Sequence, residues 1–141
     1  MSTYAVEIPV DSAVFGSTTG GFARFEYSAA VRAHGLLFIA GQVGYRPDGS
    51  LPDTIEEQTE WVLRRTEQIL RLEGLSLGDL VDVVSYHPEM QANLAGFLEV
   101  KKRFIKAPFP AWSMIGVAGL TRPEFLLEVR AVAAYPDGAA R

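Results

Sequence analysis

The chain of 141 residues contains no cysteine, which excludes disulfide bonds, thiolate catalysis, iron–sulfur clusters and cysteine-based zinc sites. It has only two histidines, too few for a histidine-rich metal centre. The longest wholly apolar run, residues 36–40, is too short to cross a bilayer. Glu7 and Asp11 interrupt any hydrophobic segment of a secretory signal. We therefore expect a cytoplasmic protein without a membrane partner.

Basic residues are also in the minority. Thirteen Lys and Arg face 17 Asp and Glu, and the net charge of −4 argues against nucleic-acid binding driven by phosphate contacts. A hydrophobic content of 48% with 21% charged residues is typical of one globular domain. We expect that domain to span residues 1–141, with an N-terminal arm and loop at 1–24 and a loose tail at 136–141. The glycine-rich segment 16–21 lacks the lysine of a phosphate-binding loop.

Hydrophobic periodicity predicts five strands and two helices in the order β β α β α β β. The expected strands are residues 25–31, 36–40, 80–86, 111–117 and 126–134. A capping pattern at 53–56 opens the first helix and Gly74 ends it, while the second helix is expected at 92–105. The turn His34-Gly35 joins the first two strands. This order implies an α+β fold, with one sheet and both helices on one of its faces.

The last expected strand is apolar on both sides. Leu127, Val129, Ala131 and Ala133 alternate with a second set that contains Glu128, Arg130 and Val132. No further helix is available to cover the second face of the sheet. A second copy of the chain would cover it, so we expect a homo-oligomer with its sheets turned inward.

A few residues could carry chemistry. Glu128 interrupts an apolar strand, where a carboxylate needs either an ion pair, with Arg130 or a neighbouring subunit, or a role as general acid or base. His87 is expected to be an exposed loop residue or, alternatively, a pocket histidine. Trp112 and Tyr27 could pack in the core or line a pocket. For each of these four residues, both the structural and the functional interpretation stay open.

Several segments together carry a family resemblance. They are Tyr27, GLLFIAGQVG at 35–44, EEQTEWVL at 56–63, DLVDVVSYHPEM at 79–90, PAWSMIGVAGL at 110–120 and LLEVRAVA at 126–133. In these segments, over residues 25–135, the chain resembles the RidA/YjgF family, once described as translation inhibitors or endoribonucleases.

The resemblance implies a chorismate-mutase-like fold and a homotrimer with an inner β-barrel and three clefts between subunits. Active members of the family hydrolyse enamines and imines, such as 2-aminoacrylate and its iminopropionate tautomer, to 2-keto acids and ammonia. They use no metal and no organic cofactor. Tyr27, Gly41, Gln42 and Glu128 match the family's pattern.

Three positions depart from that pattern. The arginine that binds the substrate carboxylate in the family is Trp112 here, the serine before Gly41 is Ala40, and the small or cysteine position is Met114. The YjgH-like subgroup is the most similar, since it also has tryptophan at the arginine position. Loss of a bidentate arginine contact should weaken binding of a carboxylate substrate by orders of magnitude. We therefore expect 2-iminopropionate not to be the usual substrate.

Three functions from different classes stay open. The first is a cofactor-free hydrolase of C=N bonds, with Glu128 as catalytic residue and a substrate cleft lined by Tyr27, Gly41, His87, Trp112 and Met114. The second is a non-catalytic module that binds an apolar or aromatic metabolite in a Trp-lined cleft. The third is a structural or holdase-like trimer. For either use of the cleft, we expect Trp112 and Glu128 to face the same cavity.

Overall fold

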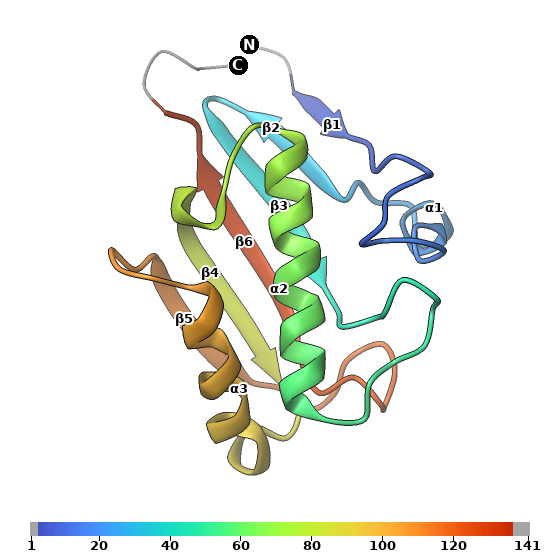
Figure 1. Ribbon diagram of the computed structural model, residues 1–141, viewed down its shortest axis with the longest axis vertical. Coiled ribbons are helices and arrows are strands. Elements are labelled where there is room, and N and C mark those ends of the chain that lie inside the picture. The colour runs from blue at the N-terminus through green and yellow to red at the C-terminus, as the bar shows by residue number, and fades with distance from the viewer. Residues whose placement is uncertain (1–2, 137–141) are drawn as a thin grey trace.

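One mixed sheet of six strands carries both long helices on a single face in the computed structural model, which describes residues 3–136 (Figure 1). Most of the expected tail at 136–141 lies outside the described residues. The strands lie in the order β1-β2-β3-β6-β4-β5, and only β4 and β5 pair in parallel. The elements are β1 Tyr4–Val6, α1 Gly20–Arg24, β2 Ala30–Ala33, β3 Leu36–Gln42, α2 Ile55–Leu72, the 3₁₀ helix η1 Leu77–Asp79, β4 Leu80–His87, α3 Met90–Phe104, β5 Ala111–Gly116 and β6 Glu128–Ala134. The predicted α+β layer arrangement is confirmed.

Local signals fix the hairpin and the central helix. His34 and Gly35 both have positive φ, 53° and 76°, as a two-residue hairpin turn between β2 and β3 requires. The Thr54 side chain accepts a hydrogen bond from the Glu57 backbone N–H at 3.2 Å, so the N-cap of α2 is one residue later than predicted. Gly74, with φ 73°, follows the last turn of α2 as expected. No helix within residues 3–136 has the length and apolar character needed to span a membrane.

The N-terminal part of the chain is more regular than the sequence indicated. β1 pairs with β2 at the edge of the sheet, and the glycine-rich segment leads into α1. The strand predicted at 25–31 is wrong in its first half. Glu26 has φ 60°, and the Tyr27 N–H donates to the Phe22 carbonyl at 3.0 Å, so the chain turns there before β2 begins. A hydrogen-bonded turn at the end of α1 therefore overrides the alternating pattern.

The later elements differ from prediction at their ends. β4 continues to His87, which the sequence had placed in a loop or at a pocket rim. α3 begins at Met90, two residues before the predicted start at 92. β6 begins at Glu128, two residues after the predicted start at 126. As a result, two of the residues singled out for chemistry, His87 and Glu128, occupy strand termini at one end of the sheet.

The two faces of the sheet separate as the alternation in β6 predicts. Leu127, Val129, Ala131 and Ala133 are buried. Val132 lies opposite Phe38 of β3, on the face that neither long helix covers. On this open face, Phe38 is 44% exposed and Ile115 of β5 is 43% exposed. An apolar sheet face of this kind favours association with another protein surface.

We predict that the open face forms the interface of a homotrimer. Val132→Asp would place an unpaired charge in that interface and should shift the protein toward monomer. Multi-angle light scattering at micromolar concentration measures the change, with circular dichroism as a check of folding. Val10→Asp is the matched control, because Val10 is 94% exposed and belongs to the N-terminal segment. A stable monomer of the unmodified protein would contradict the prediction.

Candidate functional site

Glu128 stands at the start of β6, where its side chain packs against Gly41 of β3. Its register partner on the other side is Tyr86 of β4. The pairing of β3 with β6 is irregular between Ile39 and Gln42, as at a β-bulge. A Cβ atom on residue 41 would overlap the Glu128 carboxylate. The glycine therefore makes the space that the carboxylate occupies.

The Glu128 carboxylate is half-buried and makes no hydrogen bond or ion pair in the part of the chain that the structure describes. The ion pairs found among residues 3–136 include neither Glu128 nor Arg130, although the two share the open face. Burial raises the pKa of the Glu128 carboxyl above its ordinary value. The ion pair with Arg130 considered from the sequence is absent, and the arrangement is that of a carboxyl available for proton transfer.

Tyr27 lies beside this carboxyl, in the turn that precedes β2. Burial raises the pKa of the Tyr27 hydroxyl, and the charge of Glu128 raises it further. The ring packs edge-on against Phe22, with 5.5 Å between centroids. An open groove of about 370 Å³ adjoins it; the lining residues are Tyr27, Ser28, Val31, Phe38, Ile39, Ala40, Arg130 and Ala131. The structure thus brings Tyr27, Gly41 and Glu128 together within one chain.

Trp112 lies on the other face of the sheet. It pairs with Val83 in the β4–β5 register, and its ring packs against Phe97 of α3 at 6.1 Å between centroids. Lys101 Nζ lies 4.4 Å from the centroid of the Trp112 ring, a cation–π contact. Trp112 Nε1–H donates to Ser85 Oγ at 2.9 Å. Within one chain, Trp112 is thus partly buried and packs against the core.

Within one chain, Trp112 and Glu128 lie on opposite faces of the sheet, so the cavity that both are expected to face at a subunit boundary stays a prediction. Glu128 pairs with Tyr86 and Tyr86 with Ile115, whereas Trp112 shares its side of β5 with Met114 and Gly116. Alternate residues of a strand point to opposite faces, so the two side chains diverge. A cleft that uses both would have to form between two copies of the chain. Met114, 37% exposed on edge strand β5, is available to such a contact.

His87 is buried, with 1% of its surface exposed, which corrects the expectation of an exposed loop residue. Its Nε2 lies 2.8 Å from Ser85 Oγ, and its ring packs edge-on against Phe97 at 4.7 Å between centroids. Burial lowers the pKa of His87. Nδ1 is the one buried side-chain nitrogen or oxygen among the described residues that has no hydrogen-bond partner.

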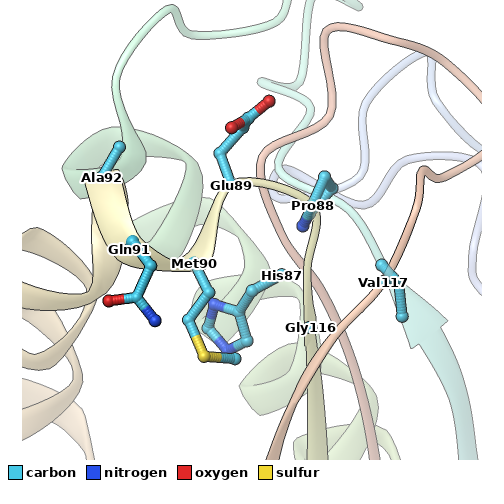
Figure 2. Close-up of a pocket in the computed structure, with 8 residues that line it drawn as sticks. All are labelled: His87, Pro88, Glu89, Met90, Gln91, Ala92, Gly116 and Val117. Atoms are coloured by element: carbon cyan, nitrogen blue, oxygen red, sulfur yellow. The ribbon is translucent and has the colours of Figure 1, made fainter.

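An open groove of about 500 Å³ lies next to His87, at the start of α3 (Figure 2). The residues that line it are His87, Pro88, Glu89, Met90, Gln91, Ala92, Gly116 and Val117. This groove and Glu128 lie at the same end of the sheet, because the ends of β4 and β5 and the start of β6 meet there. They belong to opposite faces.

Sequence reasoning missed Ser85 and Arg65. Arg65 of α2 is 3% exposed, and its Nη1 donates to Thr18 Oγ1 at 2.7 Å. Its guanidinium lies 4.3 Å from the centroid of Phe15. Burial lowers the pKa of Arg65 to about 10, so it remains charged at neutral pH. A signal was present, since position 65 lies three residues after Val62 and four before Ile69, within the buried stripe of the helix.

Neither Arg122 nor Arg130 stands beside Trp112, the position of the family arginine. Arg122 is in the loop before β6, where its Nη1 donates to the Tyr45 hydroxyl at 2.9 Å. Arg130 lines the open-face groove beside Tyr27. Within residues 3–136, no three His, Asp or Glu side chains converge as metal ligands would.

Comparison with known proteins places this chain among relatives of the same fold. A protein of Escherichia coli (strain K12) named RutC family protein YjgH is 32% identical over 117 residues, 82% of this chain and 88% of that protein. The solved structure of Protein YJGH superposes with a TM-score of 0.76 and 30% identity, over 89% of this chain and 97% of that one. Reactive Intermediate Deaminase A, chloroplastic, of Arabidopsis thaliana is 33% identical over 99 residues, 67% of this chain and 51% of that protein.

The family model described as Endoribonuclease L-PSP matches residues 21–135, which include every element from β2 to β6. Together with the 32% identity to YjgH over 82% of the chain, this match shows that the protein belongs to the Endoribonuclease L-PSP family, also called the RidA/YjgF family.

Proposed function

We propose that the protein hydrolyses a C=N bond in an imine or enamine metabolite, without a cofactor, and that Glu128 is the catalytic residue. The observation that carries the proposal is the half-buried Glu128 carboxyl, which has a raised pKa and makes no hydrogen bond or ion pair among residues 3–136. A carboxyl that is buried without an ion pair is costly, and such groups are concentrated at functional sites. A relative named Reactive Intermediate Deaminase A supports the choice of reaction.

The proposed reaction needs a group that acts as both general acid and general base. Water adds to the imine carbon and one of its protons moves to nitrogen, which gives a carbinolamine. Transfer of the remaining hydroxyl proton to nitrogen then breaks the C–N bond and leaves a carbonyl compound and ammonia. A Glu128 carboxyl with a raised pKa can donate a proton to the imine nitrogen and take one from the attacking water. Tyr27, whose hydroxyl is affected by the Glu128 charge, would orient the water or the substrate.

The same arrangement argues for a substrate other than 2-iminopropionate. At the position of the family's carboxylate-binding arginine, the Trp112 indole donates its N–H to Ser85 and packs against Phe97. It offers no guanidinium to a carboxylate. In an intersubunit cleft, Trp112 and Met114 of one copy would instead give an apolar wall opposite Tyr27, Gly41 and Glu128 of another, and His87 would lie behind Trp112.

We predict that Glu128→Gln abolishes turnover and leaves assembly and ligand binding intact, because the amide keeps the shape and cannot exchange a proton near neutral pH. The assay measures ammonia release from a panel of imines that an amino-acid oxidase generates in place, with semicarbazide as trapping competitor. Glu7→Gln, at an exposed position of the N-terminal segment, is the matched control. Ligand binding without turnover in the unmodified protein would contradict the enzyme and favour a binding module.

Glu128→Gln should also change the dependence of stability on pH. Burial raises the pKa of the Glu128 carboxyl above 4.5, so its contribution to stability is complete below pH 4.5 and is lost as the pH rises through the raised pKa. We expect the variant to melt at a higher temperature than the unmodified protein at pH 8, and this difference to disappear near pH 4. Thermal melts at both pH values test this. A lower melting temperature of the variant at pH 8 would show that Glu128 serves as a structural ion pair.

We predict that 2-iminopropionate is a poor substrate. Without the bidentate guanidinium, kcat/KM should be at least about tenfold lower than in a family member that carries the arginine. A side-by-side assay of the two proteins with the same imine preparation measures the ratio. Equal kcat/KM values would show that the arginine position does not govern this protein's choice of substrate.

A further inference from the structure

We propose that the groove between the end of β4, the end of β5 and the start of α3 binds the carboxylate group of a small metabolite. The donors would be His87 Nδ1–H and the free backbone N–H groups in the first turn of α3. The inference rests on the proposed function only in its choice of ligand class, since a 2-oxo acid is the product of imine hydrolysis on an amino-acid skeleton. The site is defined by its own hydrogen-bond pattern.

The hydrogen bonds of Ser85 determine which nitrogen of His87 carries the proton. Trp112 Nε1–H can only donate, so Ser85 Oγ accepts that bond. In the part of the chain that the structure describes, the other hydrogen-bond partner of Ser85 Oγ is His87 Nε2, at 2.8 Å. If Ser85 Oγ accepted a second bond from Nε2–H, its own buried hydroxyl proton would have no partner among residues 3–136, so donation of that proton to an unprotonated Nε2 is favoured. In a neutral imidazole, the proton is then on Nδ1.

The Nδ1–H donor is buried and has no partner in the protein. His87 is 1% exposed, and Nδ1 makes no hydrogen bond to any described residue. The ring lies beneath the first turn of α3, with Nδ1 on the side that faces Met90 and Gln91 (Figure 2). A buried donor without an acceptor is destabilising, and a ligand oxygen in the groove would supply the acceptor.

The start of α3 adds further donors at the same place. The N-cap residue Glu89 makes no side-chain capping bond, and no acidic residue lies in the first turn that follows. The N–H groups of Met90, Gln91 and Ala92 have no partner within the helix, because its first backbone hydrogen bond runs from the Asn93 N–H to the Glu89 carbonyl. The Glu89 carboxylate points away from the His87 ring in Figure 2. Helix N-termini favour anions because their N–H groups and dipole converge there.

Space and position also fit a small carboxylate. The groove measures about 500 Å³, and Gly116 leaves the β5 side of it without a side chain. Trp112 stands at the position of the family arginine. Through its hydrogen bond to Ser85, it favours the His87 tautomer in which Nδ1 carries the proton. The groove would thus bind a carboxylate at the end of β4 and the start of α3, on the face of the sheet opposite Glu128.

Nitrogen NMR tests the tautomer directly. In protein labelled with ¹⁵N-histidine, His34 and His87 are the only two histidines, and a long-range ¹H–¹⁵N spectrum distinguishes Nδ1–H from Nε2–H. We expect the Nδ1–H form of His87. Addition of pyruvate should shift His87 Nδ1 and the amide signals of Met90, Gln91 and Ala92. An Nε2–H tautomer, or no shift at these four positions, would overturn the proposal.

Two pairs of variants show which groups bind pyruvate. The measurement is the pyruvate dissociation constant of each variant. His87→Phe keeps the ring contact with Phe97 and removes the donor, and it should weaken binding at least about tenfold. His34→Asn, in the exposed hairpin turn, should leave binding unchanged. Glu89→Ser adds an N-cap that competes for the helix amides, so it should raise the melting temperature and weaken binding. Glu89→Ala removes the same charge without adding a cap, and it should bind pyruvate more tightly than Glu89→Ser.

The outcomes separate this site from the proposed function. Unchanged pyruvate binding in His87→Phe, together with loss of binding in Lys101→Met, would overturn the proposal and assign the carboxylate to the ammonium above Trp112. Pyruvate binding at His87 without turnover of any imine would leave this site standing and remove the hydrolase. Imine turnover that is unchanged in His87→Phe would leave the hydrolase standing and overturn this site.

Discussion

The alternation of side chains along β6 is the constraint on which the rest of the molecule depends. One set of its residues, Val129, Ala131 and Ala133 among them, is small or branched and is buried beneath the helices. The other set places Glu128, Arg130 and Val132 on the open face. Because β6 lies between β3 and β4, this division extends through the register to both neighbours. It decides which side chains can share a site and which cannot.

Much of the fold could be predicted because its signals are local. The hairpin turn at His34 and Gly35, the stop at Gly74 and the apolar stripe of α2 each need only a few adjacent residues, and each was correct. The predicted strand at 25–31 failed because a turn bond from Tyr27 to Phe22 depends on α1, a short helix without a strong periodic signal. The second copy on the open sheet face was inferred from the two apolar sides of the last strand, and the family resemblance added the trimer; the assembly stays a prediction.

The site could be predicted only in part. Glu128 was identified from one charge in an apolar strand, and its closeness to Gly41 and Tyr27 agrees with the family pattern. The divergence of Trp112 from Glu128 follows from the relative register of β4, β5 and β6. Register between strands distant in the chain is set by packing, which no single strand's pattern reveals. Ser85 was missed for a similar reason, since a serine in a buried strand gains meaning only from the Trp112 and His87 side chains beside it.

The replacement of an arginine by Trp112 changes more than one contact. An indole has a single donor, and here that donor is used within the protein, on Ser85. Its ring face holds the Lys101 ammonium, and its edge packs near Phe97. The position at which the family has a carboxylate-binding arginine is thus occupied by Trp112, which belongs to a polar and aromatic cluster between the sheet and α3. The chemical character of the cleft follows from that cluster as a whole.

The close contact between Gly41 and Glu128 has a consequence for the divergence of related chains. A single methyl group at position 41 would displace the Glu128 carboxylate. The glutamate would remain in the sequence, and the sheet and the helices would be unchanged. Two relatives could then carry the same glutamate and the same fold, and differ in whether that glutamate reaches a substrate. Retention of an acidic residue is therefore insufficient evidence of retained chemistry in such lineages, and the neighbouring glycine is the more sensitive marker.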